Sequence, residues 1–67
     1  MITKEQREKI KKNLLKGDMS IIARNLNMSK SAVYYFFRGE GENLRILNEA
    51  VSLVERRKDL ANKVDKW

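Results

Sequence analysis

The stretch from Asp18 to Gly39, DMSIIARNLNMSKSAVYYFFRG, decides the fold of this 67-residue chain. Its first part spaces apolar residues as a helix does, and we expect Asp18 to cap that helix. Asn27 follows, the non-glycine residue that best tolerates the positive φ of a tight turn. Ser29 then supplies the N-cap of a second helix, which runs to about Arg38 and stops at Gly39. The stretch therefore predicts two short helices joined by a tight turn.

Four consecutive aromatic residues, Tyr34, Tyr35, Phe36 and Phe37, lie in the second of these helices. Because a helix turns by about 100° per residue, they separate into two pairs on different faces. One face carries Ala32, Val33, Phe36 and Phe37, and the other carries Lys30, Ser31, Tyr34, Tyr35 and Arg38. We expect the phenylalanines to anchor the helix in a core and the tyrosines to contact a partner. In a competing interpretation, the tyrosines merely lie half-buried against neighbouring helices.

The composition narrows the class of protein. The chain has no cysteine and no histidine, which argues against disulfides, the usual zinc sites and the commonest general acid and base. Its carboxylates are spaced as on solvated helix faces, so we expect no enzyme and no cofactor. The formal net charge of +6 favours a polyanionic partner. We find no signal peptide and no membrane span, and expect a cytoplasmic protein.

The N-terminal segment predicts a helix from after Thr3 to Gly17. Thr3 and Gln6 have the spacing of a capping box, and Gly17 suits a left-handed helix end. The apolar stripe of this helix consists of Ile10, Leu14 and Leu15. Its basic residues, which we expect to face solvent, are Lys4, Arg7, Lys9, Lys11, Lys12 and Lys16.

The C-terminal segment carries two apolar stripes. We expect the first to close the core, and it consists of Leu44, Leu47, Val51 and Val54. The second has heptad spacing and runs through Ile46, Ala50, Leu53, Arg57, Leu60, Val64 and Trp67. On one interpretation the helix continues beyond the core, and a second subunit pairs with it through Ile46, Leu53, Leu60, Val64 and Trp67. On the other, Asp59 caps a separate fifth helix that folds back on Ile10 and Leu14.

Asp18 to Gly39 resembles the helix-turn-helix of the phage-repressor and Cro family, and also that of lactose-repressor-type headpieces. The resemblance covers about a third of the chain. It depends on Ala23 at the helix crossing, on Ser29 as cap, and on the apolar positions Ile22, Leu26, Met28, Val33 and Phe36. Asn27 stands where these families usually have glycine. The resemblance implies that the second helix enters the major groove of double-stranded DNA.

The same resemblance assigns roles to individual residues. Those at base-reading positions are Lys30, Ser31, Tyr34 and Tyr35. Those expected to hold backbone phosphates are Ser20, Ser29, Arg38, Asn43 and Arg45.

We therefore expect an all-α fold: a small bundle of four or five helices with a helix-turn-helix and a long C-terminal helix or helix pair. Residues 1–57 form the expected DNA-binding domain, and residues 58–67 form a helical extension that is a possible dimerisation element. The expected function is sequence-specific binding of an inverted-repeat DNA site by a homodimeric transcriptional repressor, without a small-molecule effector. Two alternatives remain at this point: an antitoxin-like or adaptor-like protein-interaction module, and a nonspecific nucleic-acid-binding protein. Binding that weakens steeply with salt distinguishes DNA binding from an aromatic protein interface.

Overall fold

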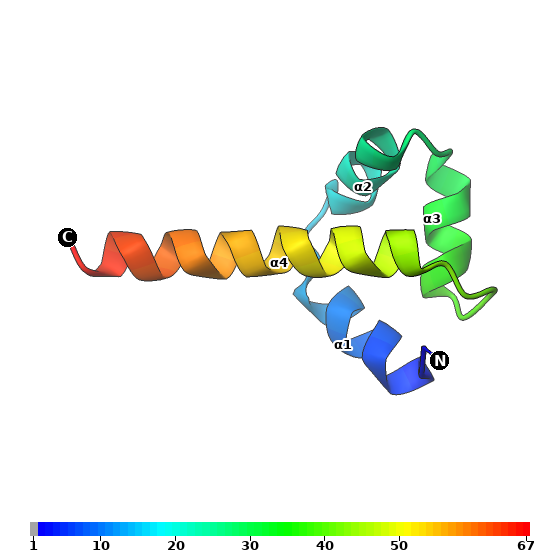
Figure 1. Cartoon of the computed structure of the whole chain (residues 1–67), viewed down its shortest axis with the longest axis horizontal. Helices are drawn as coiled ribbons and strands as arrows, with labels where there is room; N and C mark the ends of the chain where they lie inside the picture. The colour runs from blue at the N-terminus through cyan, green and yellow to red at the C-terminus, as the bar shows by residue number, and fades with distance from the viewer. Residues whose placement is uncertain (1) are drawn as a thin grey trace.

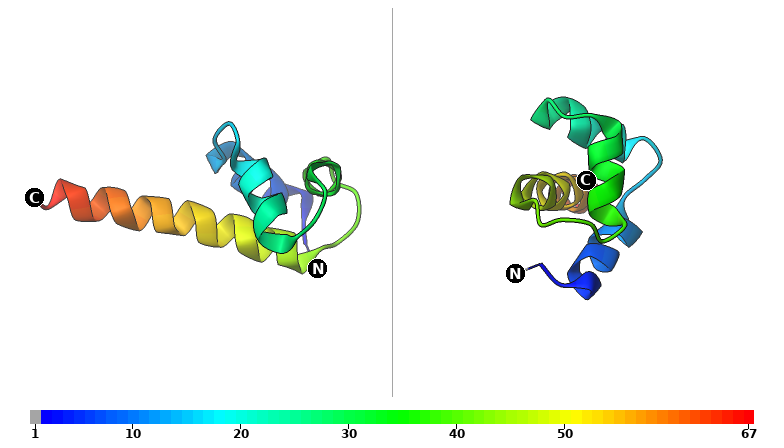
Figure 2. Two further views of the ribbon diagram at one scale, coloured as in Figure 1. Left: turned by 90° about the horizontal axis from the view of Figure 1, so that it is seen from above. Right: turned by 90° about the vertical axis from the view of Figure 1, so that its right-hand side faces the viewer.

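The computed structural model describes residues 2–67, which form four helices and no strand. They are α1 (Lys4–Asn13), α2 (Asp18–Leu26), α3 (Lys30–Phe37) and α4 (Leu44–Asp65). The first three gather around the N-terminal half of α4, and the C-terminal half of α4 projects away from them (Figure 1). Viewed along α4, α3 lies across the end of the molecule, with α2 on one side and α1 on the other (Figure 2). The expected all-helical fold with a long C-terminal helix is confirmed.

The core lies where α2, α3 and α4 meet. Its buried side chains come from the N-terminal segment and from these three helices: Ile2, Ile22, Ala23, Val33, Phe36, Phe37, Ile46 and Ala50. The Phe36 and Phe37 rings pack edge to face, with their centroids 5.1 Å apart. The predicted inward face of α3 is thus confirmed at Val33, Phe36 and Phe37.

α1 ends earlier than expected. Its capping box is present, because the Thr3 hydroxyl accepts from the Gln6 N–H and the Gln6 side chain accepts from the Thr3 N–H. The helix nevertheless stops at Asn13, and Leu14 is extended. The reason is that the Asp18 carboxylate accepts from the Leu15 N–H at 2.6 Å, so this N–H makes no helical hydrogen bond. Leu15 leaves the predicted apolar stripe and is 61% exposed.

Asp18 does not cap α2 as expected. Gly17, in a left-handed conformation at φ 90°, holds the N-cap position, and Asp18 is the first residue of the helix. Its side chain turns back to Leu15 and across to Arg57 on α4, where its Oδ1 accepts from the Arg57 guanidinium at 2.9 Å. Asp18 therefore ties the start of α2 to the middle of α4.

The C-terminal segment forms one long helix, α4, rather than two. It is one continuous helix from Leu44 to Asp65, so no separate fifth helix begins near Asp59. The boundary expected at residues 57 and 58 falls inside this helix, and every residue from 58 to 67 is exposed. The Asn43 side chain caps the helix by accepting from the N–H groups of Arg45 and Ile46.

Residues of both stripes of α4 lie in the core, although we expected only the first stripe there. Ile46 is 1% exposed, so it lies inside the chain's own core and its predicted place in a subunit seam is wrong. Leu53 is partly buried against the same core. Leu44, expected in the core, is 62% exposed. Because α1 and α2 lie on different sides of α4 (Figures 1 and 2), the helix buries a wider face than either stripe alone.

Candidate nucleic-acid interface

The outward face of α3 presents four polar and aromatic side chains together. Lys30 and Ser31 are exposed, and Tyr34 and Tyr35 are 47% and 52% exposed. The Arg38 guanidinium carbon lies 5.8 Å from the centroid of the Tyr35 ring, within cation–π range. Each tyrosine is therefore half-buried, as the competing interpretation expects, and keeps about half of its surface accessible to a partner. The predicted base-reading residues thus share one accessible surface.

The turn before α3 has the predicted conformation. Asn27 adopts the left-handed region at φ 56°, and the Met28 N–H donates to the Ala23 carbonyl at 2.9 Å. The Ser29 hydroxyl accepts from the Ala32 N–H at 3.2 Å, which confirms the N-cap. These local bonds fix the angle at which α3 leaves α2.

The C-terminal end of α3 is held by Arg7, a residue expected to face solvent. Arg7 is instead 6% exposed, and its guanidinium donates to the carbonyls of Phe36, at 2.9 Å, and Gly41. The guanidinium carbon also lies 4.5 Å from the centroid of the Phe36 ring. A cation at these carbonyls complements the negative end of the α3 dipole. α3 is thereby fixed at both ends.

Three of the residues predicted to bind phosphate have structural contacts of their own. The Ser29 hydroxyl caps α3, and the Asn43 side chain caps α4. The Arg45 guanidinium donates to the Leu26 carbonyl at 3.2 Å, at the end of α2. The preference of Ser and Asn for N-cap positions is the sequence signal for the first two contacts.

Ser20 lies in a surface depression where the end of α1, the start of α2 and the start of α3 meet. Two predicted base-reading residues, Lys30 and Tyr34, also line it. Lys11 and Lys16 line it as well, although sequence reasoning treated them only as solvated charge. The depression therefore joins the outward face of α3 to basic residues of the N-terminal segment.

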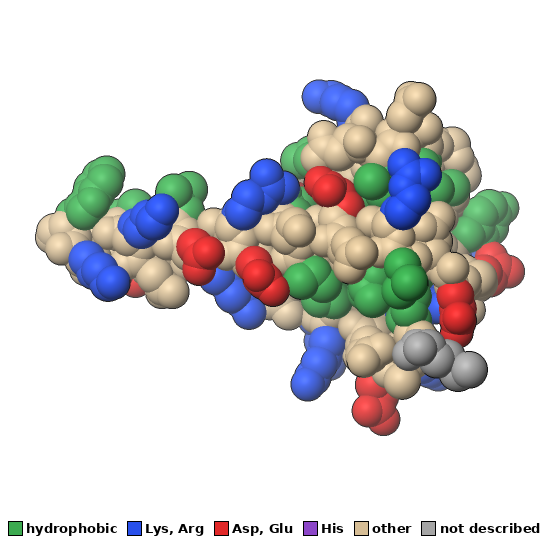
Figure 3. Space-filling model, in the orientation of Figure 1, with side chains coloured by type: hydrophobic (Ala, Val, Ile, Leu, Met, Phe, Trp, Pro, Cys, Tyr) green, Lys and Arg blue, Asp and Glu red, His purple; other side chains and the backbone are tan. Residues whose placement is uncertain are grey.

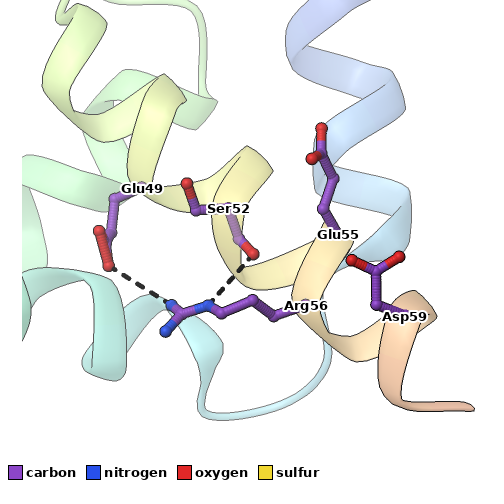
Figure 4. A pocket seen from close by; sticks show the side chains of 5 residues that line it. All are labelled: Glu49, Ser52, Glu55, Arg56 and Asp59. Carbon is purple, nitrogen blue, oxygen red and sulfur yellow. Dashed lines mark hydrogen bonds and ion pairs between the residues drawn. The ribbon is translucent and has the colours of Figure 1, made fainter. Parts of the chain in front are cut away.

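A different hollow on α4 is acidic. Glu49, Glu55 and Asp59 line it together with Ser52 and Arg56 (Figure 4). The Arg56 guanidinium reaches Glu49 at 3.9 Å and donates to the Ser52 carbonyl at 3.3 Å. Glu49 also accepts from the Asn25 side chain at 3.1 Å. Carboxylates repel a polyanion, so this face of α4 is unsuited to nucleic acid.

The partly buried contact between Asp18 and Arg57 affects the ionisation of Asp18. Burial on its own raises the pKa of the Asp18 carboxyl. The Arg57 guanidinium and the Leu15 N–H, which both donate to the carboxylate, outweigh this effect and hold the pKa below its ordinary value. Arg57, which interrupts the apolar stripe of α4 in the sequence, is therefore bound to its own domain.

The free half of α4 carries the exposed remainder of the predicted seam. Leu60, Val64 and Trp67 are 64%, 49% and 95% exposed. Hydrophobic side chains gather at this end of the molecule, opposite the end that holds α3 (Figures 1 and 3).

Among residues 2–67, no helix is long and apolar enough to cross a membrane.

No family model, curated protein or solved structure matches the chain.

Proposed function

We propose that this chain binds double-stranded DNA sequence-specifically by placing α3 in the major groove. The observation that supports this most is the outward face of α3. There Lys30, Ser31, Tyr34 and Tyr35 are accessible together, while the opposite face of the helix is buried.

The chemistry of these four side chains suits base edges. A lysine donates to guanine O6 or N7, and a serine hydroxyl donates or accepts. A tyrosine combines a hydroxyl hydrogen bond with ring contact to a thymine methyl group. Because α3 is held at both ends, its backbone needs little further ordering on binding.

We also propose that two copies bind together, through Leu60, Val64 and Trp67 on the free half of α4. In heptad spacing, Leu60 takes position d and Val64 takes position a, a combination that favours two-stranded pairing. A homodimer matches the two-fold symmetry of an inverted-repeat site. Such a protein acts in the cytoplasm on nucleoid DNA and represses transcription by excluding polymerase from the site.

Fluorescence anisotropy with a labelled random-sequence duplex tests whether the partner is DNA. We expect a dissociation constant of about 10⁻⁴ to 10⁻⁶ M at physiological salt, and weaker binding as KCl is raised, because bound phosphates release counterions. The alternative of a protein-interaction module predicts no binding to the duplex at physiological salt. That result would refute the proposed function.

A further inference from the structure

The depression between α1, α2 and α3 has the charge of a polyanion site. Lys11 of α1, Lys16 of the loop before α2 and Lys30 of α3 line it, and all three are exposed. No carboxylate is among the described residues that line it. The acidic residue nearest to Lys16 along the chain, Asp18, is 3% exposed and paired with Arg57. Glu8, one turn before Lys11, is exposed but lines a separate hollow with Lys11 and Lys12. The lysines therefore face the depression without a competing anion in its lining.

The depression is also continuous with the outward face of α3. Lys30 and Tyr34 belong to both surfaces. With α3 in the major groove as proposed, a DNA strand that borders this groove passes next to these two residues. Ser20, in the first turn of α2, adds a hydroxyl donor to the same lining.

We infer that the sugar-phosphate backbone of one DNA strand follows this depression, with Lys11 and Lys16 contacting its phosphates. The inference rests on the proposed function and adds two phosphate-binding residues to it. Lys11 and Lys16 neutralise phosphates and fix the position of α3, and they read no base. They contribute equally to binding of specific and random duplexes.

The salt dependence of affinity measures these contacts directly. Each neutralised phosphate contributes about 0.9 to the slope of log K against log salt for duplex DNA. We therefore compare the wild type with the double variant Lys11→Gln/Lys16→Gln, using a random-sequence duplex over a KCl series. Two lost contacts lower the magnitude of the slope by about 1.8.

A matched control separates a local contact from the effect of net charge. The double variant Lys58→Gln/Lys66→Gln also removes two of the 15 basic residues, but from the free half of α4 and its C-cap. All four lysines are exposed, so both variants should fold, which circular dichroism and thermal unfolding verify. We expect this control to keep the wild-type slope.

The outcomes distinguish the inference from the proposed function. A smaller slope only in Lys11→Gln/Lys16→Gln supports the inference. If both double variants lose slope equally, or if neither does while the wild type binds duplex, the inference is overturned and the proposed function stands. If the wild type binds no duplex at all, both fail.

Discussion

The guanidinium of Arg7 lies against the ring of Phe36 and donates to the carbonyl of the same residue at 2.9 Å. One side chain of α1 thus contacts both the Phe36 ring, which anchors α3 in the core, and the C-terminal end of α3. Arg7 is 6% exposed, and its hydrogen bond to the Phe36 carbonyl is buried.

Replacement of Arg7 should therefore destabilise the fold. A hydrogen bond from a charged group contributes about 1.5–3 kcal/mol, so we expect Arg7→Met to lower the free energy of unfolding by at least about 2 kcal/mol. Arg7→Lys keeps the charge but loses the planar pair of donors. Its free energy of unfolding should therefore lie between those of the wild type and Arg7→Met. Urea denaturation measures both variants. Wild-type stability of Arg7→Met would show that the contact contributes nothing.

Side chains on the outward face of α3 should determine which DNA sequence the protein prefers. Lys30→Ala and Tyr35→Ala should each weaken binding to a preferred duplex by about 1–3 kcal/mol and leave binding to random duplex much less affected. Both side chains are exposed, so the fold should remain intact. Anisotropy titrations with the two duplexes make the comparison. Equal losses on both would contradict base reading and leave only a phosphate contact.

Asp18 should make stability depend on pH in acid. Its folded-state pKa is below the ordinary value of about 3.9. The unfolded chain therefore binds the proton first as pH falls. The stabilisation is complete above about pH 4 and is lost as pH falls through the lower folded-state pKa.

Asp18→Asn should remove this pH dependence and lower stability at neutral pH, because it leaves Arg57 without its carboxylate. Urea midpoints of the wild type and the variant from pH 2 to pH 7 provide the measurement. Parallel curves for the two proteins would refute this role for Asp18.

Association of two copies should depend on the free half of α4. Burial of a leucine contributes about 1.5–3 kcal/mol, and a homodimer contains each residue twice. Leu60→Glu should therefore raise the dimer dissociation constant by at least about 100-fold. Leu44→Glu is the control, since Leu44 is exposed to a similar extent, 62% against 64%, at the other end of α4. Sedimentation equilibrium that finds unchanged association in Leu60→Glu would exclude this seam.

Local signals in the sequence predicted much of α3 and of the turn before it. Asn27, Ser29 and Gly39 act within a few residues of their own positions, and each has the conformation or hydrogen bond expected of it. The helical period of about 100° per residue then assigned the phenylalanines and tyrosines to opposite faces. No long-range contact was needed for these predictions.

The errors lie where contacts join distant segments. Arg7 reaches acceptors 29 and 34 residues away, and Asp18 pairs with Arg57 across 39 residues. Nothing near these residues in the sequence distinguishes them from solvated charges or an ordinary cap. The stripes of α4 were misassigned at Ile46 and Leu44 for a related reason. A helix pattern read alone does not show how many neighbours surround the helix.

Sequence-specific recognition by α3 is tested most directly by selection of bound duplexes from a random DNA pool at about physiological salt. The account predicts enrichment of an inverted repeat whose half-sites lie about one helical turn, roughly 34–36 Å, apart. A pool that remains unenriched after repeated rounds would contradict sequence-specific recognition.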